Sequence, residues 1–151
     1  MQPKYKRLCE DIMFEIGQID VVVEKINKLK TDVTETNIAA TGTFLMNFYN
    51  GIENIMKRCA KEYYKNMPVG GNWHKELLMQ SCKSSSMKIA LFKKETVDNL
   101  YDYLSFRHFF IHGYGFKLKW DKMKLLVDNI DKLWGEINAQ IKYFVDTIAN
   151  Q

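Results

Sequence analysis

Apolar residues recur at steps of three and four over four long stretches of the chain, and this spacing predicts amphipathic helices. The four stretches cover about residues 5–30, 35–64, 95–112 and 121–148, and a shorter one covers residues 73–81. The last stretch repeats two apolar series at steps of seven: Val127, Trp134, Ile141 and Ile148, and Ile130, Ile137 and Phe144. A repeat of this length predicts a helix that packs along the whole molecule.

Residues with helix-capping side chains precede two of these stretches. Asp32 and Thr34 are both candidate N-caps of the second helix, since Asp32 has capping-box spacing to Glu35. Asp121 is the candidate N-cap of the last helix, where Trp120 and Leu125 have the spacing of a hydrophobic staple.

Composition supports a helical protein of one domain. Apolar residues make up 46% and charged residues 26% of the 151 residues, as in ordinary globular proteins. Eight glycines and two prolines are few for a sheet protein with many turns. We therefore predict an all-α antiparallel bundle of four long helices and one short helix, formed by residues 1–151 as a single domain.

The sequence predicts a cytosolic protein without a membrane span. No apolar run approaches the roughly 18 residues that a spanning helix needs. Charged residues stand near the N-terminus where a signal peptide would have its apolar stretch. The three cysteines, Cys9, Cys59 and Cys82, have no disulfide or zinc spacing, so we interpret them as small buried hydrophobic residues.

The excess positive charge lies in one segment. Residues 103–124 carry five basic side chains against one acidic side chain, and the rest of the chain carries 17 of each, which leaves the net charge of +4 in this segment. A local positive field attracts phosphates, although a solvated lysine-rich loop has the same composition.

Arg107 occupies an unexpected position in this segment. The apolar series of the preceding helix continues through Leu100 and Leu104 to Arg107, where a core residue is expected. An arginine is almost never fully buried unless it is paired. This face therefore lines a cleft or a subunit interface; the alternative is that Arg107 points outward or pairs with a buried carboxylate such as Glu53.

His112 stands directly before Gly113, which suits the left-handed position after a helix C-terminus. The negative end of the helix dipole favours a protonated imidazole there, and such a histidine can transfer protons. A plain capping role is the alternative. Arg107 and His112 are five residues apart, roughly 140° around a helix, so they do not converge in one chain unless the helix ends between them. A two-fold dimer would bring both pairs into one groove.

Arg107, His112 and Tyr114 together form the pattern R-x4-H-x-Y, with the polar residue His108 directly after the arginine. This pattern resembles the motif of the HEPN superfamily, specifically of the HepT-like ribonuclease toxins. The stretches NFYNGIENIMKR, NWHKELL and WDKMKLLVDNI are also similar to this group, and the resemblance covers nearly the whole chain.

The resemblance implies a metal-independent ribonuclease toxin that acts as a homodimer, with no cofactor and with a composite site at the interface. It implies that Arg107 and His112 are catalytic and that His108 is an accessory polar residue. Tyr114 matches the tyrosine that a minimal, MntA-like nucleotidyltransferase antitoxin modifies with AMP. A half-buried loop aromatic is the alternative interpretation of Tyr114.

The residue types suit this chemistry, because RNA carries its own nucleophile, the 2′-hydroxyl. A histidine can take or supply a proton, and an arginine can hold the phosphate oxygens as their charge increases. Lys117 and Lys119 are candidate RNA contacts. Two other functions remain open: a binding module that holds nucleotides or a nucleotidyltransferase without cleaving, and a dimeric scaffold in which the motif only joins helices.

Overall fold

The computed structural model describes residues 4–114 and 118–151, without the side chain of Tyr114. The elements in chain order are α1 (Lys6–Leu29), α2 (Glu35–Glu62), α3 (Trp73–Gln80), α4 (Lys94–Phe109), the short π-helical segment η1 (Phe110–Tyr114) and α5 (Trp120–Ala149). The predicted all-α architecture of four long helices and one short helix is therefore confirmed. In the part of the chain that is described, β structure is limited to one isolated bridge between Ser85 and Lys88.

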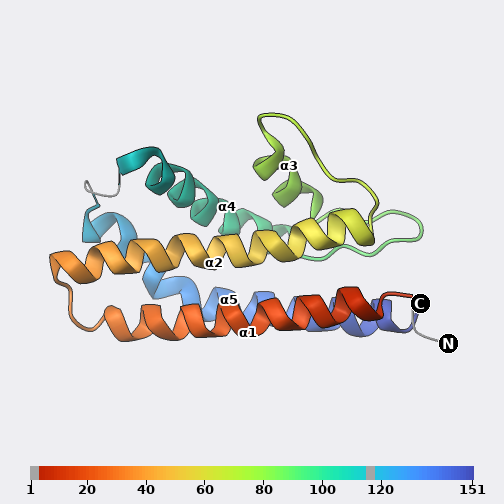
Figure 1. The fold of residues 1–151 in the computed structure, drawn as a ribbon, viewed down its shortest axis with the longest axis horizontal. Helices are drawn as coiled ribbons and strands as arrows, with labels where there is room; N and C mark the ends of the chain where they lie inside the picture. Colours follow the sequence, from red (N-terminus) through yellow and green to blue (C-terminus); the bar gives the residue numbers. More distant parts are fainter. Residues whose placement is uncertain (1–3, 115–117) are drawn as a thin grey trace.

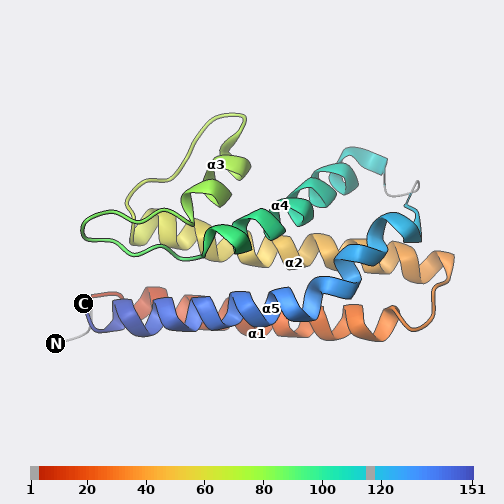
Figure 2. The same cartoon turned by 180° about the vertical axis from the view of Figure 1, so that it is seen from behind.

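The long helices form a bundle whose first two members make an antiparallel hairpin. α5 runs beside α1 and also contacts α2 and α4, and α4 crosses α2. The short helix α3 lies against α2 and α4, on the side of α2 that faces away from α1 (Figures 1 and 2). α2 is thus the central element, with α1 and α5 on one side and α3 and α4 on the other.

The predicted apolar series form the core. The two series in α5 are buried over their whole length, as are most of the series in α1 and in α2. Each large apolar side chain that is fully buried contributes roughly 1.5–3 kcal/mol through its removal from water. The bundle is therefore held together along its length by hydrophobic burial.

One of the two helix-cap predictions is wrong. The hydroxyl of Thr34 accepts a hydrogen bond from the backbone N–H of Asn37 at 3.1 Å, so Thr34 is the cap of α2. By contrast, α5 begins at Trp120, one residue before the predicted cap Asp121. The Trp120 ring packs against the core, and this packing starts the helix earlier than local capping chemistry would. The predicted staple is wrong too, because Leu125 is 66% exposed.

Gly42 in α2 sets how closely the end of α4 approaches α2. A Cβ atom at Gly42 would lie 3.0 Å from a ring carbon of Phe110 and 2.7 Å from a methyl carbon of Leu118. Since both distances are shorter than ordinary van der Waals contact, the residues on either side of the 115–117 segment pack against α2 only because residue 42 has no side chain. This contact holds the end of α4 on the central helix.

The cysteines are free, as their spacing predicted. Cys59 is buried, and Cys9 and Cys82 are partly buried. Burial raises the pKa of the Cys59 thiol and of the Cys9 thiol, which keeps both in the neutral form. Within residues 4–114 and 118–151, none of the helices combines the length and apolar character needed to cross a membrane.

Candidate functional site

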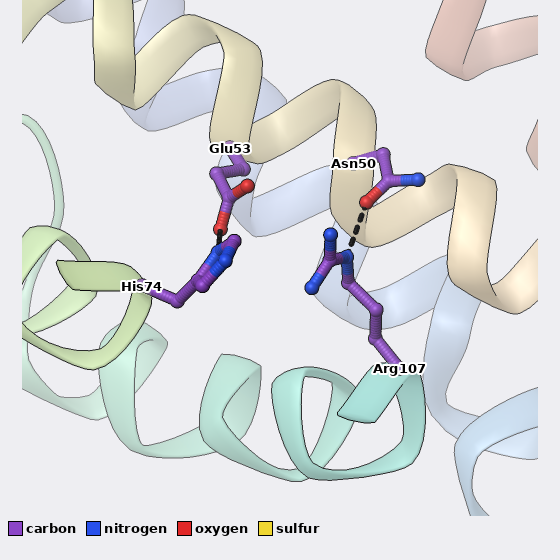
Figure 3. Close-up of polar contacts among 4 residues, drawn as sticks. All are labelled: Asn50, Glu53, His74 and Arg107. Atoms are coloured by element: carbon purple, nitrogen blue, oxygen red, sulfur yellow. Dashed lines mark hydrogen bonds and ion pairs between the residues drawn. The ribbon is translucent and has the colours of Figure 1, made fainter. Parts of the chain in front are cut away.

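Arg107 reaches from α4 to α2 instead of entering a sealed core. The residues before it in the same series, Leu100 and Leu104, are buried, whereas Arg107 is half-buried. Its Nε donates a hydrogen bond to Oδ1 of Asn50 at 2.5 Å (Figure 3). Among the described residues, no carboxylate forms an ion pair with Arg107. The guanidinium is therefore anchored by a neutral amide, and its positive charge is not compensated.

The carboxylate that was considered as the partner of Arg107 pairs with a histidine instead. Glu53 of α2 is only 4% exposed, and its Oε2 lies 2.7 Å from Nδ1 of His74 in α3 (Figure 3). The His74 ring stacks on the Trp73 ring, with centroids 3.6 Å apart. The sequence suggested Glu53 as a possible partner of Arg107, and the structure shows that Glu53 pairs with His74 instead.

The hydroxyl of Tyr49 is buried close to these charged groups. Burial raises the pKa of Tyr49, the Glu53 carboxylate raises it further, and the Arg107 guanidinium opposes both effects. The hydroxyl has no hydrogen-bond partner within the described residues. α2 therefore presents a neutral phenol, an amide and a carboxylate toward α3 and α4.

A pocket of about 300 Å³ lies between α3 and α4 and contains part of the predicted site. It is lined by Gly71, Asn72, His74, Lys75, Tyr101, Leu104, Ser105, Arg107 and His108. The lining residues include two basic side chains, two histidines and no acidic side chain. Such a lining attracts an anion, because opposite charge is drawn into a cleft with low-dielectric walls.

His112 lies just beyond the pocket, where α4 ends. Gly113 has a φ of 83°, so the left-handed conformation predicted for this glycine is confirmed. Nδ1 of His112 lies 2.7 Å from the carbonyl oxygen of His108, and the two imidazole rings are 4.1 Å apart. Because a carbonyl only accepts, Nδ1 of His112 carries the proton. The Nε2 lone pair of the neutral ring is then available to take a proton.

The structure brings Arg107 and His108 into one pocket, with the His112 ring in tilted contact with the His108 ring at its edge. Arg107 is bonded to α2, and His112 is bonded back to its own helical turn. No hydrogen bond joins Arg107 to His112 in the described structure. Within one chain, these two residues therefore face different neighbours.

The remaining predicted site residues are placed less fully. Lys117 and the side chain of Tyr114 lie outside the described part of the molecule. Tyr114 is the last residue of η1, and only its backbone is described. Lys119 is exposed and lines a second pocket, of about 580 Å³, between the end of α4 and the start of α5. Lys119 is thus separate from the pocket that contains Arg107.

Two residues of the site were not recognised as functional from the sequence. Asn50 gave no signal, since a half-buried asparagine in a helix is common. For His74 the sequence contains an indirect signal, because Glu53 falls within the apolar band of α2 and a buried carboxylate requires a partner. Asn72 is the N-cap residue of α3, and its side chain forms no cap hydrogen bond.

Residues 40–148 match a family model described as "HepT-like protein". The match begins in α2 and ends near the last residue of α5, so it includes every residue of the pocket between α3 and α4. Comparison with curated proteins and with solved structures gives no match.

Proposed function

The chain belongs to the HepT-like family of HEPN-type proteins, and on that basis we propose that it is a metal-independent ribonuclease toxin of a toxin–antitoxin system. It acts as a homodimer, in which Arg107 and His112 of both protomers line one groove. Two-fold symmetry places two copies of each residue in such a groove. Arg107 of one protomer can then lie close to His112 of the other, although the two residues do not converge within one chain.

The observation that carries this proposal is the uncompensated guanidinium of Arg107. The nearby acidic side chain Glu53 is occupied by His74, and Asn50 fixes the arginine without neutralising it. A phosphate that enters the pocket meets this charge together with Lys75. Arginine is suited to this task because its planar guanidinium binds two phosphate oxygens at once.

The reaction follows from the substrate's own nucleophile. Nε2 of His112 takes the proton of the 2′-hydroxyl, whose oxygen then forms a bond to phosphorus as the bond from phosphorus to the 5′-oxygen breaks. Arg107 stabilises the negative charge that accumulates on the non-bridging oxygens. The leaving 5′-oxygen takes up a proton, so the products are a 2′,3′-cyclic phosphate and a 5′-hydroxyl. His108 supports His112 through its carbonyl oxygen and through the contact between the two rings.

The proposed antitoxin is a minimal nucleotidyltransferase that transfers AMP to Tyr114. Tyr114 follows His112 by two residues, directly after the left-handed Gly113. An AMP group at this position adds bulk and negative charge next to the proposed base. It therefore repels the RNA backbone and blocks cleavage.

The test is incubation of the purified chain with RNA in the presence of EDTA. We expect cleavage by the wild type and a loss of about 10²–10³-fold in Arg107→Ala and in His112→Ala, the range expected when one transition-state contact or one proton-transfer group is removed. Arg58→Ala is the matched control, because Arg58 is an α2 arginine that pairs with Asp11 of α1, away from the pocket. RNA that is bound but never cleaved would instead indicate the non-catalytic binding module.

A further inference from the structure

The pair of Glu53 and His74 is a buried charge arrangement that the two motif residues do not explain. A carboxylate that is 4% exposed is costly unless it is paired and hydrogen-bonded. Its partner is Nδ1 of His74 at 2.7 Å, contributed by a different helix (Figure 3). A deeply buried acid that holds a histidine at the wall of a pocket is an arrangement that enzymes use to orient an imidazole.

This hydrogen bond requires a proton on Nδ1 of His74. The ionised carboxylate only accepts, so Nδ1 donates to it. Nε2 has no partner among the residues that the structure describes. With Nδ1 engaged by Glu53, Nε2 is the nitrogen through which the His74 ring can exchange a proton with a bound group.

The ring is held in place on a second side. Trp73 stacks on it at 3.6 Å with an interplanar angle of 29°, and Nζ of Lys57 lies 5.6 Å from the centre of the Trp73 ring. The His74 side chain keeps 32% of its surface exposed, and it lines the same pocket as Arg107. A phosphate bound by Arg107 in that pocket is thus brought to an oriented imidazole.

We propose that His74 is a second catalytic histidine, which protonates the leaving 5′-oxygen, and that Glu53 is its positioning residue. The inference rests on the proposed ribonuclease function. As the 2′-oxygen forms its bond to phosphorus and the bond to the 5′-oxygen breaks, the Nε2 proton of His74 passes to the 5′-oxygen. His112 takes the 2′-hydroxyl proton, so one proton is taken and one is given. Exchange with water then restores both rings.

The groups around His74 support this role over a competing one for His108. The charged groups that face His74 are Glu53 and Lys57 from α2, Lys75 from α3, and Arg107 and His108 from α4. Of the two pocket histidines, only His74 has a carboxylate partner within the described structure. The His108 ring instead contacts the His112 ring at an interplanar angle of 41°, where it supports the proposed base.

The experiment compares two substrates, of which only one has a leaving oxygen that needs a proton. RNA requires protonation of its 5′-oxygen, whereas uridine 3′-(4-nitrophenyl phosphate) releases a stable phenolate. The variants are His74→Asn, Glu53→Gln and His112→Asn in the full chain. The amide of His74→Asn can still donate to Glu53, which preserves the link between α2 and α3, and melting temperatures check each fold.

We expect His74→Asn to lose about 10²-fold or more on RNA and to match the wild type on the nitrophenyl ester. His112→Asn should lose activity on both substrates, because both need the base. Glu53→Gln should show the His74 pattern in weaker form. The alkaline limb of the pH–rate profile on RNA should disappear in His74→Asn, since a general acid must be protonated to act.

The two ways of failing are distinguishable. A wild-type chain that cleaves neither substrate overturns the proposed ribonuclease function and this inference with it. A wild type that cleaves both, combined with a His74→Asn variant that is unchanged on RNA or equally impaired on both substrates, overturns the role of His74 alone. Equal impairment with a lowered melting temperature would identify the pair of Glu53 and His74 as a purely structural link.

Discussion

Arg107 and Asn50 are joined by a hydrogen bond of 2.5 Å from Nε to Oδ1, across the contact between α4 and α2. The acceptor is an amide and not a carboxylate. The bond therefore restricts the guanidinium to one orientation without cancelling its charge. An ion pair in the same place would hold the arginine as firmly but would have to be broken before a phosphate could bind.

Asn50→Asp tests this relationship with a change of one functional group. The new carboxylate should form an ion pair with Arg107 and compete with the phosphate, so we expect a higher KM for RNA. The thermal stability should be unchanged or slightly increased, because a half-buried pair replaces a neutral hydrogen bond. Steady-state cleavage kinetics and thermal melts measure the two effects.

The matched control for this variant is Asn99→Asp. It adds the same negative charge to α4, at an exposed position that lines a different pocket. Since surface charges are screened over about 10 Å at 0.1 M salt, the control should leave KM near the wild-type value. A KM that rises equally in both variants would mean that net charge, and not the contact with Arg107, controls RNA binding.

The fold was predictable from the sequence because the apolar period determines which side of each helix is buried. The two step-of-seven series of α5 are buried without exception, and the elements end within a few residues of their predicted positions. The start of α5 was assigned wrongly because capping rules consider only local chemistry. The packing of the Trp120 ring on the core extends the helix by one residue before Asp121.

The site was predictable only in part. Arg107 could be recognised because a charge on an apolar series stands out within a single helix. Its partner Asn50 is 57 residues away, and His74 is 21 residues from Glu53. Such pairings depend on how α3 and α4 sit on α2. An eight-residue helix after a loop with a proline and two glycines has too little apolar periodicity to reveal that placement.

Tyr114 provides a test of the proposed antitoxin that is independent of RNA cleavage. Tyr114→Phe removes the phenol oxygen that would accept AMP, so a minimal nucleotidyltransferase should no longer label the chain. The variant should remain an active ribonuclease and become resistant to neutralisation. Mass spectrometry of the chain after incubation with ATP and the nucleotidyltransferase measures the label.

Tyr101→Phe is the control for labelling. Tyr101 is 43% exposed on α4 and lies outside the motif. We expect this variant to be labelled like the wild type. Labelling of Tyr114→Phe at the wild-type stoichiometry would place the modification on another residue.

Two buried tyrosines should respond differently to loss of the hydroxyl group. Tyr103 donates a hydrogen bond of 2.6 Å to the carbonyl oxygen of Leu126, so Tyr103→Phe should cost about 0.5–1.5 kcal/mol of unfolding free energy. The Tyr49 hydroxyl is buried without a partner in the described structure, so Tyr49→Phe should be neutral or stabilising. Urea unfolding at neutral pH measures both changes.

The same pair predicts an effect at alkaline pH. Burial raises the pKa of Tyr49 and of Tyr103 in the folded state, so the unfolded chain loses these protons first, near a pKa of about 10. Their contribution to stability is complete below that pH and declines as the pH rises above it. Each Tyr→Phe variant should therefore lose less stability than the wild type above about pH 10. An unchanged slope in both variants would contradict the burial of the phenols.

Gly113 should be sensitive to substitution, for a reason that lies in the backbone and not in crowding. Its φ of 83° is unfavourable for any residue with a Cβ atom, although a Cβ there would meet no atom of the described structure within 4 Å. Gly113→Ala should therefore cost about 1–2 kcal/mol. It should also lower RNA cleavage, because the turn at Gly113 holds His112 against the carbonyl oxygen of His108.

Gly135 supplies the opposite case for the same substitution. It lies within α5, where a Cβ atom would likewise meet nothing within 4 Å of the described residues. An alanine in a regular helix is more favourable than a glycine, so Gly135→Ala should stabilise the protein by about 0.5–1 kcal/mol and leave cleavage unchanged. Urea unfolding and RNA cleavage, measured on both variants, separate the two effects. If Gly113→Ala proved as stable and as active as Gly135→Ala, the left-handed turn would not be what positions His112.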